Sequence, residues 1–121
     1  MKVAVTSQGR DLDSLVDPRF GRTRWFIVVD TETGRFDVVD NEQNVNAVQG
    51  AGIQAARQVS QHGASVLLTG HCGPNAFRTL QAAGINVVVG VDGTVAGAIE
   101  RFKRGELSPA DRPDVDGHWS A

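Results

Sequence analysis

Apolar and polar side chains at the start of the chain follow the period of β-strands. They alternate over residues 1–6, which predicts a strand. Two further runs, residues 25–30 and 36–39, are rich in aromatic and β-branched side chains. Gly34 lies between these runs and can adopt the positive φ of a tight turn, so the two runs are predicted to form an antiparallel hairpin.

The later part of the chain alternates between helical spacing and short apolar runs. Helices are predicted over residues 53–62, 74–83 and 94–104. Two apolar runs, residues 65–69 and 85–91, separate them and are typical of strands buried on both faces. The predicted order is β-β-β-α-β-α-β-α. This order indicates an α/β fold with a mixed sheet of about five strands flanked by helices, because the crossovers require parallel pairing and the hairpin requires antiparallel pairing.

Three segments show neither period. Residues 7–23 form a long, charged loop, and a loop of this length in a compact domain is usually functional or disordered. Residues 41–50 are polar and irregular. Residues 106–121 contain prolines and turn residues, and we expect them to be an irregular C-terminal tail. Residues 1–105 are therefore expected to form a single α/β domain.

Composition excludes several classes of protein. The 121 residues carry a formal charge of −2, which provides no overall basic field for nucleic acid or an anionic membrane. No apolar run approaches the roughly 18 residues of a membrane span, and the N-terminus lacks the pattern of a signal peptide. The single cysteine, Cys72, can make no internal disulfide. We expect a cytoplasmic, monomeric protein.

The turn between the second predicted helix and the strand before it is the strongest candidate site. Open α/β sheets bind ligands where a parallel strand ends and a helix begins. Backbone N–H groups and the helix dipole attract anions there and favour a thiolate at the cysteine, while the histidine adds a possible metal ligand. The alternative interpretation is a tight turn with a buried, inert cysteine. The candidate residues are Gly70, His71, Cys72, Gly73, Pro74 and Asn75, with Cys72 and His71 as candidate metal ligands.

A second candidate segment lies in the long loop. Arg19 and Arg22 flank Gly21 and could clamp an anion with their forked guanidinium groups. The alternative is a surface ion pair between Asp17 and Arg19 that contributes little.

The third candidate segment precedes the first predicted helix. Asn44, Gly50 and Gly52 would place another helix N-terminus beside the cleft. The glycines do not complete a dinucleotide-binding motif, because residue 55 is alanine. No triad, acid pair or metal cage is evident along the chain, so an enzyme is not expected.

Four motifs in this order resemble the dinitrogenase iron–molybdenum cofactor biosynthesis family, which includes NifX, NafY and the C-terminal part of NifB. They are the opening strand, residues 17–22 (DPRFGR), residues 50–52 (GAG) and residues 69–77 (TGHCGPNAF). The resemblance covers about residues 1–105. Residues 117–119 (GHW) are also similar to the orange-protein branch, whose members carry a molybdenum–copper sulfide cluster.

The resemblance implies a ribonuclease-H-like fold without nuclease activity, and the binding or delivery of a metal–sulfur cluster. In the orange-protein branch the cluster is held as a thiometallate anion without covalent protein ligands, and members are often associated with P-loop ATPases of the MinD type. Arg19, Gly21 and Arg22 match the family's loop. Its strand–helix turn is matched by Gly70, Gly73, Pro74 and Asn75.

We therefore expect a carrier that binds an anionic metal–sulfur cluster non-covalently between the three candidate segments. The expected cargo is a molybdenum–copper sulfide cluster, or alternatively an iron–molybdenum cofactor precursor. Two other functions remain open: a protein-interaction module for a MinD-type P-loop ATPase without a cluster of its own, and a small anion or nucleotide binder.

Overall fold

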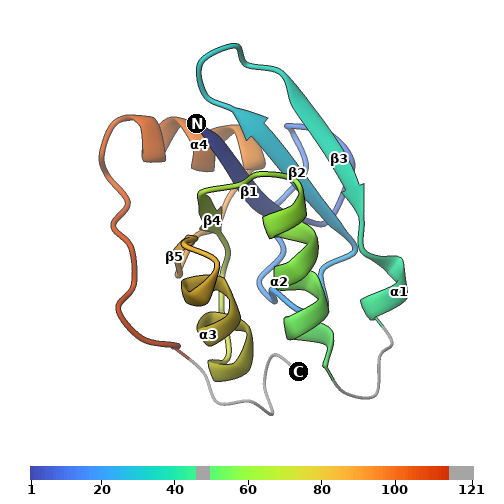
Figure 1. Ribbon diagram of the computed structural model, residues 1–121. Coiled ribbons are helices and arrows are strands. Elements are labelled where there is room, and N and C mark those ends of the chain that lie inside the picture. The colour runs from blue at the N-terminus through green and yellow to red at the C-terminus, as the bar shows by residue number, and fades with distance from the viewer. Residues whose placement is uncertain (46–49, 115–121) are drawn as a thin grey trace.

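The computed structural model describes residues 1–45 and 50–114, and it is built on one five-stranded sheet (Figure 1). Its strands are β1 (Lys2–Ser7), β2 (Trp25–Asp30), β3 (Phe36–Asp40), β4 (Val66–Leu68) and β5 (Asn86–Val88), in the order β3-β2-β1-β4-β5. β2 pairs with β3 in the hairpin and with β1 on its other side, and both pairings are antiparallel. β4 pairs with β1 and with β5, and both pairings are parallel. The predicted α/β fold with a mixed sheet is confirmed.

The three predicted helices are found, and a fourth short one accompanies them. They are α2 (Ala51–Gln61), α3 (Pro74–Ala82) and α4 (Val95–Lys103). The additional helix α1 (Glu42–Val45) lies in the segment predicted to be irregular, so that prediction is wrong for these residues. One turn of helix takes 3.6 residues, so a helix this short cannot show a period in its apolar pattern. Residues 46–49 lie outside the described residues.

The two faces of the sheet are buried under different helices. α2 and α3 cover one face and α4 covers the other (Figure 1). The strands serve both cores because their side chains alternate between the faces: Ala4 packs with α2 and α3, whereas Val3 and Val5 pack with α4. β4 is therefore buried on both faces, as its apolar run predicts, and β1 is also buried on both faces although its sequence alternates.

The described part of the tail returns along the edge of the sheet to the start of α3. Residues 106–114 have no regular secondary structure. The N–H of Ala110 donates to the carbonyl of Val87 at 2.7 Å, and the N–H of Asp114 donates to the carbonyl of Cys72 at 3.3 Å. Residues 115–121, which include the GHW motif, lie outside the described residues. Within the described ranges, no helix is long and apolar enough to cross a membrane.

Candidate functional site

The long loop between β1 and β2 packs directly against the turn that follows β4. A Cβ atom on Gly70 would lie 2.6 Å from the Cα of Pro18, so only glycine allows this approach. Arg19 forms a parallel bridge with His71, and the N–H of Phe20 donates to the carbonyl of His71 at 3.3 Å. The Phe20 side chain is fully buried. This part of the loop is therefore a fixed wall of the site.

Two buried threonines join the carboxyl ends of β1 and β4 beneath this wall. The hydroxyl of Thr6 donates to the carbonyl of Asp17 at 2.7 Å and lies 3.0 Å from the hydroxyl of Thr69. Burial raises the pKa of Asp17, and its carboxylate accepts the backbone N–H of Arg19 at 3.0 Å, a contact that lowers the pKa in turn. Sequence reasoning missed the threonine pair, because a threonine at the end of a strand resembles any other strand residue.

Arg22 and Asn44 connect the long loop to α1. The Nη1 of Arg22 donates to the carbonyl of Val45 at 2.9 Å. Asn44 is buried, and its amide donates to Oδ1 of Asn41 at 2.7 Å, while the amide of Asn41 donates to the carbonyl of Thr23 at 2.8 Å. Asn44 thus has a positioning role. The structure exposes Arg19 and buries Gly21 between the two arginines.

The starts of α2 and α3 lie against each other at this end of the molecule. Gly50, at φ 78°, precedes α2, and Gly73 precedes α3, whose first residue is Pro74 as predicted. A Cβ atom on Gly52 would lie 2.9 Å from the Cβ of Ala76. Neither helix has a side-chain cap. Within the described residues, the first-turn amides have no hydrogen-bond partner: Ala51, Gly52 and Ile53 in α2, and Asn75 and Ala76 in α3.

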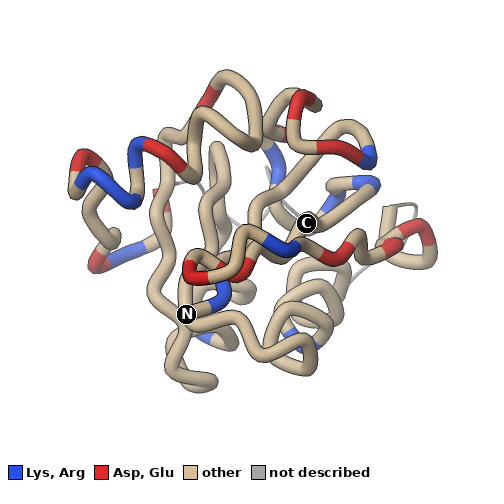
Figure 2. The backbone as a smooth tube through the Cα atoms, turned by 90° about the horizontal axis from the view of Figure 1, so that it is seen from above, with Lys and Arg blue, Asp and Glu red and all other residues tan. Residues whose placement is uncertain are grey.

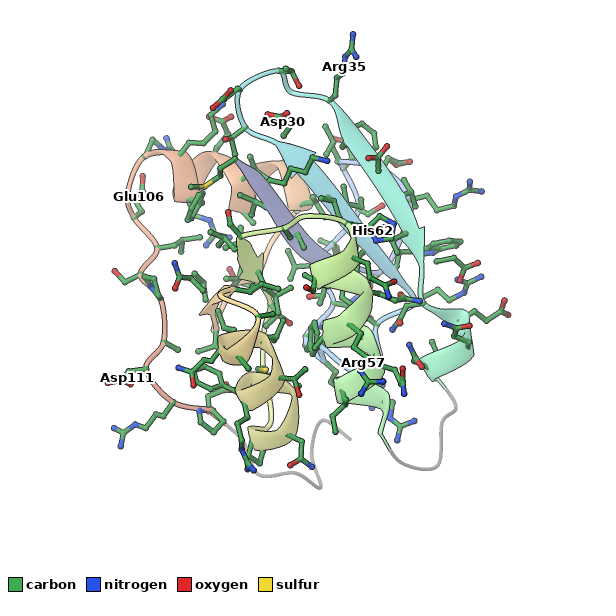
Figure 3. The ribbon with its side chains drawn as sticks, in the orientation of Figure 1. Asp30, Arg35, Arg57, His62, Glu106 and Asp111 are labelled. Carbon is green, nitrogen blue, oxygen red and sulfur yellow. The ribbon has the colours of Figure 1, made fainter. Side chains whose placement is uncertain are left out.

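The stretch that contains both helix starts has no acidic side chain of its own. Residues 43–91 contain no Asp or Glu, and Figure 2 shows the acidic and basic positions along the whole backbone. The cations are Arg57 on α2 and Arg78 on α3. Arg78 lines a groove of about 330 Å³ between the two helices. Figure 3 shows Arg57 in the half of the molecule near the start of α2, and Arg35 at the hairpin on the opposite end. This arrangement favours an anion at the helix starts.

The thiol of Cys72 does not face this site. It is fully buried in the core beneath α2 and α3. Burial, and to a smaller extent the carboxylate of Asp114, raises the pKa of the thiol from 9.0 to about 12. The predicted thiolate is therefore wrong, because desolvation outweighs the field of the helix start. The geometry supports the buried, inert cysteine. Within the described residues, no three His, Cys, Asp or Glu side chains are grouped to hold a metal ion.

A carboxylate from the tail occupies the donors of the turn. Oδ1 of Asp114 accepts the backbone N–H of Cys72 at 2.8 Å, and its Oδ2 lies 2.7 Å from Nδ1 of His71. Sequence reasoning missed Asp114, because an aspartate in an aperiodic tail gives no signal of where it folds.

The three segments predicted to form the site are therefore adjacent. The long loop contacts the turn through Gly70 and His71, and it contacts α1 through Arg22. The starts of α2 and α3 meet at Gly52. Of the predicted residues, Cys72 and Asn44 point into the protein, whereas Arg19 and Asn75 are exposed.

Comparisons with known proteins show the family and the fold of the chain. The profile of the family described as dinitrogenase iron–molybdenum cofactor matches residues 1–105. The apo form of the orange protein from Desulfovibrio gigas is 47% identical, with a TM-score of 0.93 over 94% of this chain and 96% of that chain. A putative NifB protein from Thermotoga is 37% identical, with a TM-score of 0.82 over 96% of this chain and 98% of the other. No curated protein matches the chain.

Proposed function

Because the chain belongs to the dinitrogenase iron–molybdenum cofactor family, we propose that it binds an anionic metal–sulfur cluster without covalent bonds and delivers it to another protein. The observation that carries this proposal is the pair of adjoining helix starts. Their first-turn amides have no partner within the described residues, and they lie in a stretch without acidic side chains. Amides at helix N-termini bind anions, since the helix dipole adds a positive potential there.

The residues divide into those that contact the cargo and those that shape the site. Arg19 and Arg22 supply positive charge from the long loop, and His71 supplies a ring nitrogen from the turn. Gly50, Gly52, Gly70, Gly73, Pro74 and Asn75 shape the helix starts and the turn, and the adjoining backbone supplies the N–H donors. Gly21 is buried within the loop, and Cys72 packs in the core. Asn44 orients Asn41, whose amide donates to the loop at Thr23. The cargo then brings its own sulfide, because the buried thiol supplies none.

The chemistry of the donors favours a preassembled anion over a bare metal ion. Amide and guanidinium groups donate hydrogen bonds and bind no metal directly, so the sulfur atoms of the cluster would face the protein. A molybdenum–copper sulfide cluster is the cargo we propose, supported by the similarity to the orange protein. An iron–molybdenum cofactor precursor is the alternative cargo. The proposal also includes a ribonuclease-H-like class, a non-catalytic role, a monomeric state and a cytoplasmic location.

The first test is reconstitution under anaerobic conditions. Apo-protein is mixed with tetrathiomolybdate and copper, separated from excess reagent, and examined by visible absorption and elemental analysis. A bound chromophore with stoichiometric metal and sulfur is expected. A colourless protein that takes up no thiometallate would contradict the carrier function and favour an interaction module for a MinD-type ATPase, or a binder of small anions or nucleotides.

The second test distinguishes a local effect of Arg19 and Arg22 from a general effect of positive charge on the protein. The double substitution Arg19→Ala/Arg22→Ala should weaken cluster binding about tenfold or more, equivalent to at least about 1.4 kcal/mol. The control Arg35→Ala/Lys103→Ala also removes two positive charges, but from the hairpin and from α4. Binding by the control should stay within about twofold of the wild type, since charges far from the ligand are screened by salt. Equal losses in both variants would refute a specific clamp.

A further inference from the structure

The tail places an acidic side chain where the proposed function requires an anion. From this juxtaposition we infer that Asp114 is an internal latch: its carboxylate occupies the donor pair formed by the Cys72 amide and the His71 ring, and the cluster displaces it on binding. This inference rests on the proposed function and concerns the regulation of the same site.

The contact has the geometry of a bound anion. Each oxygen of the carboxylate has its own partner: Oδ1 accepts the Cys72 amide at 2.8 Å, and Oδ2 lies 2.7 Å from Nδ1 of His71. The Asp114 amide donates to the Cys72 carbonyl at 3.3 Å, so a backbone hydrogen bond adds to the two side-chain contacts between the tail and the turn. A carboxylate held by two donors in this way is a close equivalent of an external anion.

The carboxylate of Asp114 contacts a stretch of the chain that has no acidic side chain of its own. Residues 43–91 supply the turn and both helix starts but no acid, so a negative charge here must come from another part of the chain or from a ligand. The tail supplies it, and the same strip of the tail contains Asp111, which makes no ion pair or hydrogen bond within the described residues. One of these two aspartates is therefore engaged by the turn and the other is not.

The contact between Asp114 and the turn is accessible to solvent, so the carboxylate can be displaced. The side chain of Asp114 is 26% exposed and that of His71 is 40% exposed, so solvent and competing anions reach the contact. Between its attachment at Ala110 and the latch, the tail borders a groove of about 200 Å³ against α3 instead of packing tightly on it. Release of Asp114 would therefore free the Cys72 amide without disturbing the core.

The test compares two substitutions that change the net charge equally. Asp114→Asn keeps the shape of the side chain and removes its charge, and Asp111→Asn makes the same change outside the contact. Tetrathiomolybdate is titrated into each full-length protein, followed by visible absorption and by the amide resonance of Cys72. If the closed latch is populated about ninety per cent of the time, its loss should raise affinity about tenfold. Asp111→Asn should stay within about twofold of the wild type.

Each outcome decides the inference. Tighter binding by Asp114→Asn alone, with a Cys72 amide that shifts in the free variant and moves further on titration, supports the latch. Equal affinity in all three proteins, or wild-type binding that leaves the Cys72 resonance unmoved, would overturn the latch and leave the carrier function intact. If none of the three binds tetrathiomolybdate, the carrier function fails and the latch fails with it. Asp114→Ala, which removes both oxygens, should repeat the result of the asparagine variant.

Discussion

The helices on the two faces of the sheet begin in opposite ways. At the start of α4, the hydroxyl of Thr94 accepts the Gly97 amide at 3.0 Å. The amides of Val95 and Ala96 donate to carbonyls of the long loop at 2.9 Å. The starts of α2 and α3 have no side-chain cap. Both faces bury an apolar core, so the difference lies in the helix ends. Thr94 and the long loop satisfy the first donors of α4, whereas within the described residues the first-turn donors of α2 and α3 have no partner. Under the proposed function, a ligand would take the place of that partner.

Gly70→Ala should have the largest effect on stability and on binding at the candidate site. The added methyl group would lie 2.6 Å from the Cα and 2.7 Å from the carbonyl oxygen of Pro18, so backbone must move. We expect a loss of about 2–3 kcal/mol in the free energy of unfolding, measured with urea, and weaker cluster binding. The control is Gly34→Ala, where φ is 78° but no atom lies within 4 Å. It should lose about 1 kcal/mol and bind normally. Unchanged stability of Gly70→Ala would disprove the close contact.

Gly52→Ala should separate the two helix starts. Its Cβ would lie 2.9 Å from the Cβ of Ala76, and we expect a loss of about 1–2 kcal/mol in urea unfolding together with weaker binding. Adding Ala76→Gly removes the opposing methyl group. The double variant should return close to wild-type stability, since the helix propensities gained at one position and lost at the other cancel. No recovery in the double variant would mean that the two positions do not oppose each other.

Thr94→Ala should affect only the α4 side. Loss of the cap to the Gly97 amide should cost about 1 kcal/mol in urea unfolding, and cluster affinity should not change. Thr94→Ser keeps a hydroxyl and should retain most of the stability. A change in cluster affinity equal to that of the Gly52 variant would remove the functional distinction between the two faces.

The smallest effect at neutral pH is expected from ionisation of the Cys72 thiol, which changes the free energy of unfolding only at higher pH. Its folded pKa is about 12 against an ordinary 9.0, so between these values the unfolded chain binds fewer protons and stability falls as pH rises. The slope should reach about 1.4 kcal/mol per pH unit at most. Urea unfolding between pH 8 and 10.5 should show this component in the wild type and not in Cys72→Ala. Rapid alkylation of the native protein by iodoacetamide at pH 8 would contradict a buried thiol.

Most of the fold could be predicted because the strands and the three longer helices each carry a local sequence pattern. Strand alternation, helical spacing and the glycines at positions 34, 63, 84 and 105 mark the elements, and each of these glycines has a positive φ. The helix α1 could not be predicted, since four residues contain too little pattern.

The candidate site was predictable in place but not in detail. Strand-to-helix turns in parallel sheets are common binding positions, so the turn at Gly70 could be chosen as a candidate from its sequence. The start of α2 could be chosen as a candidate from its glycines, which precede a helix N-terminus. The burial of Cys72 depends on which way a side chain points, and the contact of Asp114 depends on a long-range path of the tail. Both properties arise from tertiary packing, which no local pattern encodes.

The burial of Cys72 bears on how a cargo could leave the protein. A thiometallate at the helix starts would meet no accessible protein thiol within the described residues, so no sulfide exchange with the carrier would precede release. Release from the carrier would then break no bond between metal and protein, and its rate would follow solvation and counter-charge. A recipient that offers thiolates could then form bonds to the metal for which the buried thiol of Cys72 does not compete.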